Sequence, residues 1–201
     1  MAVNDKSVFS SVRGAAFIAE ANAALPSLKL FSLEAATVGE TAKKYTNLGH
    51  LSVSDLPSFD VSGGDATTKD TWLKSKFRTT YESVTGKVTI SSVQGDKETF
   101  KLMFDAAEIT GGGTAVGLDK VEQPKALFTY VEDTNTGEKF GIWIPNLSLA
   151  YSELPSLAQD DFNTFKLEGN IMTSTVLPKT KSGKASSIAF YDPDDFDKAA
   201  A

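Results

Sequence analysis

Short runs in which apolar and polar residues alternate constrain the fold of this chain more than any other feature. Between residues 84 and 93, one parity is apolar (Val84, Val88 and Ile90), and the other is polar (Thr85, Lys87, Thr89 and Ser91). Residues 163–172 repeat the pattern. A period of two is that of a strand with one buried face and one face in water. Because similar runs are separated by Gly, Pro, Asn, Asp and Ser, the sequence predicts a mainly antiparallel β fold, a sandwich or partial barrel.

A hairpin is predicted over residues 126–151. An apolar and aromatic run is followed by a turn containing Asp133, Asn135 and Gly137, and then by a returning strand. The apolar parity of the returning strand changes at Pro145. This change predicts a bulge, or a strand that moves to another sheet, at the proline.

One flanking helix is predicted from Asp96 to Ala106. Asp96 can cap its N-terminus, and apolar residues recur at helical spacing from Phe100 onwards. Residues 34–70 are polar and small, so we expect an extended loop there. The glycine-rich residues 110–124 predict a flexible connection, and residues 192–201 a flexible acidic tail.

Composition excludes several classes of chemistry. The chain has 201 residues, which predicts a single domain over 1–201, and it has no cysteine and one histidine. Disulfides and thiolate metal sites are therefore excluded, and we expect no cofactor. The formal net charge of −6 argues against a protein that holds nucleic acid by its charge. We expect no membrane segment, because no stretch approaches about 18 uninterrupted apolar residues.

Four local motifs have an ordinary interpretation that outweighs a chemical one. Gly111–Gly113 lacks the Lys-Ser/Thr of a phosphate-binding loop. His50 has no triad or paired-ligand context, and the acidic residues after Tyr191 lack the glycine and closing glutamate of a calcium loop. The three lysines of residues 179–184 are typical of a solvated turn. We therefore expect no catalytic residue, no metal site and no enzyme.

The order of features between residues 48 and 106 resembles the major tail tube proteins of siphophages, which have long non-contractile tails. Leu48-Gly49-His50 forms the family's turn, Ser62 to Thr71 its polar loop, and Trp72 with Arg78-Thr79-Thr80 its Trp and basic-Thr segment. The alternating strand and the amphipathic helix follow. The opening, from Val12 to Pro26, also resembles that of the family, with a Gly-Ala strand before a loop with proline.

The resemblance implies a structural virion protein. Such proteins form hexameric rings that stack into a tail tube, assembled in the host cytoplasm, through which the genome passes without specific binding of the DNA. The expected partners are other copies of the chain, a tape measure protein, a distal tail protein and a tail terminator. The loop over 34–70 would reach neighbouring subunits. The candidate interface residues are His50, Leu51, Leu56, Phe59, Asp65, Trp72 and Arg78.

Two questions stay open at this point. The polar strand residues Thr89, Ser91, Lys166 and Glu168 are candidates for the lumen, but parity assigns a face without saying what that face meets. A carbohydrate-binding β-sandwich that uses Trp72 and Trp143 is an alternative function. Another ring-forming tail protein of the same fold is a second alternative, and a small glycoside hydrolase, which needs two carboxylates across a cleft, is a third.

Overall fold

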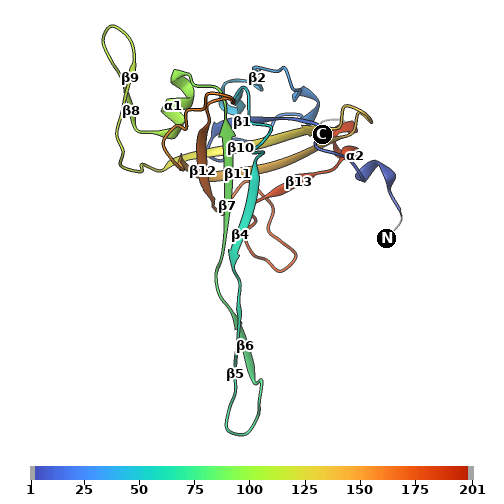
Figure 1. Ribbon diagram of the computed structural model, residues 1–201. Helices are drawn as coiled ribbons and strands as arrows, with labels where there is room; N and C mark the ends of the chain where they lie inside the picture. The colour runs from blue at the N-terminus through green and yellow to red at the C-terminus, as the bar shows by residue number, and fades with distance from the viewer. Residues whose placement is uncertain (1–2, 199–201) are drawn as a thin grey trace.

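The computed structural model describes residues 3–198, and its centre is a nine-stranded sheet in which all pairs are antiparallel (Figure 1). The strand order is β2-β3-β1-β10-β11-β12-β7-β4, with β13 paired to β11. Its strands are β1 (Arg13–Glu20), β2 (Thr37–Val38), β3 (Tyr45–Asn47), β4 (Ser58–Gly63), β7 (Val84–Ser92), β10 (Gln123–Glu132), β11 (Lys139–Tyr151), β12 (Phe165–Ile171) and β13 (Ala189–Tyr191).

Two separate hairpins and several short helices complete the described chain. The hairpins are β5 (Ala66–Lys69) with β6 (Arg78–Tyr81), and β8 (Ala106–Glu108) with β9 (Thr114–Val116). The helices are α1 (Lys97–Met103), α2 (Pro193–Asp197) and the 3-10 turns η1 (Asp5–Ser7), η2 (Leu28–Leu30) and η3 (Thr41–Lys43). The prediction of a mainly antiparallel β fold is confirmed.

The sheet curls until its two sides are joined by one short segment, residues 48–52. At one end of this segment, the Leu48 N–H donates to the Ala16 carbonyl of β1 at 2.8 Å. At the other end, the Ser52 N–H donates to the Ser91 carbonyl of β7 at 2.8 Å, and Leu51 forms a β-bridge with Ser92. The strands β1, β10, β11, β12 and β7 therefore enclose an interior, which is the predicted partial barrel.

This interior is the first of two apolar cores, and we call it the inner core. It contains buried side chains from each of the five strands, together with Leu48 and the helix residues Met103 and Phe104. Helix α1 covers one end of the barrel. Asp96 accepts from the Thr99 N–H at 2.8 Å, so the predicted cap is confirmed. The helix ends at Met103 rather than Ala106, and Gln123 donates to the carbonyls of Lys101 and Phe104 at its end.

The outer core lies on the opposite face of β1, β10 and β11. Successive residues of these strands alternate between the two cores, as Phe17 and Ile18 do in β1. This outer face is covered by Phe31, which directly follows η2, and by Val38 of β2, Tyr45 of β3 and Phe196 of α2. Three strands are thus buried on both faces, and their near-continuous apolar sequence follows from that position.

Pro145 marks a β-bulge in β11, as the change of parity predicted. Lys125 of β10 pairs with Leu147, whereas Leu127 pairs with Ile144, so that β11 contains one extra residue between these pairs. Trp143, before the bulge, lies in the outer core, and Leu147, after it, lies in the inner core. The bulge also separates the part of β11 that pairs with β13 from the part that pairs with β12.

Three local predictions are wrong. Residues 34–70 are not one loop, because they contain β2, β3, β4 and β5. Residues 110–124 include β9, and Gly111–Gly113 form the turn of a hairpin with positive φ at all three glycines. Residues 192–198 are not a flexible tail, because α2 is held by a capping box at Asp192 and by the buried Phe196. The last residues of that predicted tail, 199–201, lie outside the described residues.

We predict that Tyr45→Phe destabilises the protein by about 2 kcal/mol. The fully buried Tyr45 hydroxyl accepts from the Trp143 indole N–H at 2.9 Å and donates to the Ala23 carbonyl at 2.9 Å. Phenylalanine leaves both of these groups unpaired in the outer core. Urea unfolding followed by far-ultraviolet circular dichroism measures the difference, with Tyr81→Phe on exposed β6 as the control that should change nothing. Equal stability of the two variants would contradict the prediction.

Candidate assembly surfaces

An arm projects from the body of the protein where β4 and β7 end (Figure 1). We call residues 64–83 the arm. The pairing of β4 with β7 ends at Gly63 and Val84, and Gly63 and Gly64 both have a φ of 82°, which favours glycine. Beyond this bend the hairpin β5–β6 continues the antiparallel pairing from Ala66–Tyr81 to Lys69–Arg78. The arm therefore extends the pairing of β4 with β7 beyond the body of the protein.

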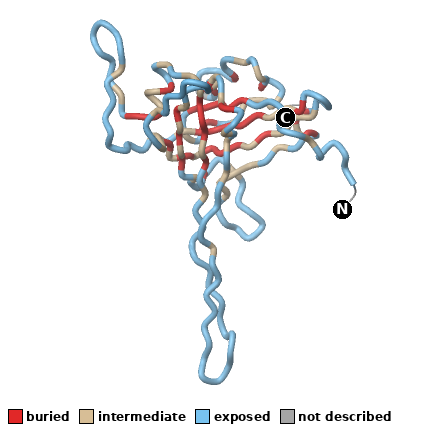
Figure 2. Tube along the Cα trace, in the orientation of Figure 1, coloured by how far each residue is buried: buried red, intermediate tan, exposed pale blue. Residues whose placement is uncertain are grey.

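All residues of β5 and β6 are exposed (Figure 2). Neither strand has an apolar face, and the pair is held by its backbone ladder and by a contact of 3.2 Å between the Thr68 and Thr79 hydroxyls. Threonines in strand pairs stabilise them through such contacts. A hairpin with water on both faces has no alternating pattern. This is why the sequence did not distinguish it from a polar loop.

The tip of the arm, residues 69–78, contains a tight turn between Thr71 and Lys74. The Thr71 N–H donates to the Lys74 carbonyl at 2.8 Å, and the Lys74 N–H donates back to the Thr71 carbonyl at 3.2 Å. Trp72 and Leu73 lie between these two bonded residues and are fully exposed, and Phe77 is largely exposed. The turn therefore presents apolar side chains at the point of the molecule farthest from its cores.

The second surface is the end of the barrel opposite α1, which we call the open mouth. It is a hollow of about 570 Å³ that continues the inner core between β1, β10 and β11 on one side and residues 50–59 on the other. Its apolar lining is Phe9, Val12, Ala15, Leu33, Leu51, Val53, Leu56, Pro57, Phe59, Val131, Phe140 and Ile142. In its lining Thr129 is buried, and its hydroxyl is one of two buried side-chain oxygens or nitrogens without a hydrogen-bond partner among residues 3–198.

The structure divides the candidate interface residues between these two surfaces. Asp65, Trp72 and Arg78 lie on the arm, whereas His50, Leu51, Leu56 and Phe59 line the open mouth. Leu51 and Phe59 are partly buried against the inner core, and the other five are exposed. Whether these residues contact other subunits stays a prediction.

Sequence reasoning missed Leu73 and Phe77 at the arm tip. A signal was present, because these residues follow Trp72 within an otherwise polar stretch. It also missed a second exposed apolar group, in the loop between β11 and β12, where Leu157 and Phe162 lie in water. Phe162 borders a further hollow of about 900 Å³ that shares Leu51 and Val53 with the open mouth.

The third surface is a polar face of the sheet, on which all four candidate lumen residues lie. Thr89 of β7 pairs with Glu168 of β12, and Ser91 pairs with Lys166. Ser91 is itself buried, because Asp55 covers it and accepts from its hydroxyl at 2.6 Å. Thr89, Lys166 and Glu168 are partly exposed. Their position on one face agrees with the predicted parity, while what this face meets stays a prediction.

Glu168 is the centre of the ion pairs on this face. Its carboxylate oxygens lie 2.5 Å from the Lys87 ammonium and 2.9 Å from the Lys120 ammonium, and the Ser152 hydroxyl donates to it at 3.2 Å. Partial burial would raise the pKa of Glu168, but its hydrogen bonds with the two ammonium groups outweigh that effect and lower the pKa from 4.5 to about 2. Lys166 is similarly placed beside Glu153 and Asp55, at 3.1 and 3.5 Å.

The three surfaces present apolar side chains and ion pairs. Among residues 3–198, no three His, Asp or Glu side chains lie close enough together to hold a metal ion. Within the same residues, no helix is long and apolar enough to cross a bilayer. Trp143 is buried in the outer core, so it forms no exposed aromatic cluster with Trp72 of the kind that a carbohydrate-binding face needs.

We predict that Glu168→Gln lowers the free energy of unfolding by about 1 kcal/mol at pH 7, a value reduced for the exposure of both lysines. A carboxylate with a lowered pKa stabilises the fold above its ordinary pKa, and this stabilisation is lost as the pH falls from about 4.5 towards 2. The difference between the wild type and Glu168→Gln should therefore shrink over that range. Urea unfolding at a series of pH values measures it, and a difference independent of pH would contradict the assignment.

Comparison with known proteins identifies the family. The chain matches the family described as phage tail tube protein over residues 1–181. It is similar to the major tail protein Gp23 of Mycobacterium phage D29, with 31% identity over 138 residues that cover 66% of this chain and 69% of the phage protein. The major tail protein Gp23 of Mycobacterium phage L5 shows 30% identity over the same lengths. The resemblance stated above is confirmed, and the chain belongs to the phage tail tube protein family, whose members are structural components of the virion.

Proposed function

We propose that this protein forms hexameric rings that stack into the tail tube of a phage, and that the genome passes through the lumen of this tube. Membership of the tail tube family supports a role in the tube, and one structural observation supports contact between copies of the chain. The arm adds nothing to either core of its own chain, and yet it is an ordered hairpin with an apolar tip. Such a feature gains stability from contact with another molecule, and in a tube of identical subunits that molecule is a second copy.

Open sheet edges support the ring. The strand order ends in β4 on one side and in β2 on the other, and neither strand has a second partner among the described residues. β4 is six residues long and its side chains are mostly exposed. An unpaired edge of this length is an aggregation hazard unless it is covered. Pairing between neighbouring subunits covers it, and a head-to-tail contact that closes by rotation forms a ring.

The ion pairs of the polar face fit a lumen that DNA must cross. Lys87, Lys120 and Lys166 each lie beside a carboxylate of the same subunit. A lysine that already has a carboxylate partner gains less from a phosphate than a free lysine does. Since each phosphate contact adds affinity, pairing the lysines internally favours passage over binding. We propose that this face, with Thr89, Lys166 and Glu168, lines the lumen.

The remaining parts of the proposal follow from a role in the tube. The protein acts as a single domain over residues 1–201 and performs no catalysis. Its subunits assemble in the host cytoplasm. The tape measure protein, the distal tail protein and the tail terminator are its partners inside the tube and at its two ends.

Electron microscopy of the purified protein over a concentration series tests the proposal. We expect rings with six-fold end views at lower concentration and hollow tubes at higher concentration. Rings of another order would contradict the hexamer. A protein that stays monomeric at the highest attainable concentration would contradict an assembly carried by the subunits alone.

We predict that a variant without the arm folds but does not form tubes. Replacing residues 64–83 with Asn-Gly joins the paired ends of β4 and β7, Gly63 and Val84, through a two-residue turn suited to a hairpin. Both cores stay intact, because the replaced residues belong to neither. Circular dichroism should show an unchanged thermal transition, and electron microscopy should show no tubes. Normal tubes would contradict a role for the arm in assembly.

A further inference from the structure

Within one chain, the apolar tip of the arm is uncovered and the apolar open mouth is unfilled. Trp72 and Leu73 are fully exposed, and Leu51, Val53 and Leu56 leave a hollow at the end of the barrel. Figure 1 shows the arm leading away from the body, so that one chain does not place its own tip in its own mouth. We propose that the arm tip of one subunit inserts Trp72 and Leu73 into the open mouth of a second copy of this chain. This inference rests on the proposed function and specifies where its contact lies.

Shape and chemistry of the two surfaces support the insertion. The tip is a narrow turn closed by two backbone hydrogen bonds between Thr71 and Lys74, so its apex presents Trp72 and Leu73 together. The mouth is a hollow of about 570 Å³, a size that falls within the range of binding pockets for small ligands. Large aromatic side chains in well-packed pockets are enriched among the residues that dominate interface binding energy.

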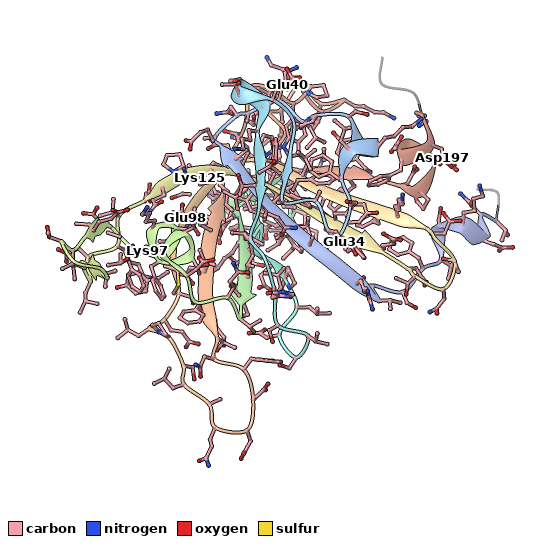
Figure 3. The ribbon with its side chains drawn as sticks, turned by 90° about the horizontal axis from the view of Figure 1, so that it is seen from above. Glu34, Glu40, Lys97, Glu98, Lys125 and Asp197 are labelled. Atoms are coloured by element: carbon pink, nitrogen blue, oxygen red, sulfur yellow. The ribbon has the colours of Figure 1, made fainter. Side chains whose placement is uncertain are left out.

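The distribution of charge favours a second copy over an unrelated partner. Residues 69–78 contain four basic residues and one acidic residue, a formal charge of +3. Since the whole chain carries −6, all other residues together carry −9. Glu34 and Arg13 both line the open mouth and offset each other, and Asp161 lines the hollow beside it, so the attraction comes from the acidic body as a whole. Figure 3 shows Glu34, Glu40 and Asp197 on the body, seen from above. A basic tip is attracted to an acidic body, and it is repelled by another tip.

The position of Thr129 shows that the inner core continues into the open mouth. Thr129 of β10 is buried and yet lines the hollow. Residues around Thr129 continue the inner core in sequence and in register, since Leu127 of the same strand belongs to that core. The apolar interior of the barrel therefore runs beyond the side chains that its own subunit supplies. An inserted tip completes it.

Cross-linking in the absence of native cysteines tests the insertion directly. The chain contains no cysteine, so that Leu73→Cys with Val53→Cys introduces the only two thiols. Val53 is exposed on the loop of the open mouth, and Leu73 is exposed at the apex of the arm. A short bis-maleimide should link assembled subunits into a ladder of covalent oligomers on a denaturing gel. The matched control, Leu73→Cys with Val116→Cys on the exposed β9, should give no ladder.

The same samples separate failure of this inference from failure of the proposed function. Tubes in the electron microscope without a ladder would overturn the insertion and leave the proposed function standing. A ladder from the control as well would also overturn it, and so would a single cross-linked species that migrates as a monomer. Rings and tubes that never form from the wild type would overturn the insertion together with the proposed function.

A second variant measures the contribution of the aromatic anchor. Trp72→Ala should raise the protein concentration needed for tube formation by about tenfold or more, as expected for an aromatic residue at the centre of an interface. Trp72→Phe keeps an aromatic ring and should have a smaller effect. Because Trp72 contributes to neither core, the thermal transition of both variants should match that of the wild type. An unchanged concentration for Trp72→Ala would overturn the proposal.

Discussion

The rest of the structure depends on the backbone contacts of residues 48–52. By bonding to β1 at Leu48 and to β7 at Ser52, this segment joins two strands that lie far apart in the sheet order. The curled sheet thereby gains an interior that side chains can fill from several directions. Without this closure, Ile18 of β1 and Ile90 of β7 would not share one core. The fold therefore depends on five residues that belong to no regular strand.

Closure also creates the two ends of the barrel, and these ends differ. Helix α1 fills one end with Met103 and Phe104, and Gln123 bonds to the carbonyls at its terminus. The other end is left with an apolar lining and a buried threonine without a partner. An asymmetric subunit of this kind suits head-to-tail contacts, because such a contact joins two different surfaces of neighbouring subunits. In the proposed contact, the arm of one subunit, which continues the same sheet, enters the open mouth of the next.

In the proposed tube, the polar face keeps its lysines paired within the chain. Glu168 gathers Lys87 and Lys120, and Lys166 is held by Glu153 and Asp55. Isolated ion pairs at a surface contribute little to stability. Their value here lies in satisfying each ammonium group within the chain. The net charge is a weaker guide to DNA binding than this pairing is, because composition cannot reveal which lysines already have a carboxylate partner.

The sequence by itself determined the strands and the helix that bury one face, because periods of two and of 3.6 record burial directly. Residues 84–92 and 165–171, the cap at Asp96 and the bulge at Pro145 were readable for this reason. The same alternation failed for the arm, whose strands bury neither face, and for α2, which is too short to show a period. Family resemblance singled out residues at the arm and the open mouth, but only the tertiary structure separated them into two surfaces. The closure at residues 48–52 brought Leu51 and Leu56 opposite β10, and no pattern along the chain encodes a contact between segments so distant in sequence.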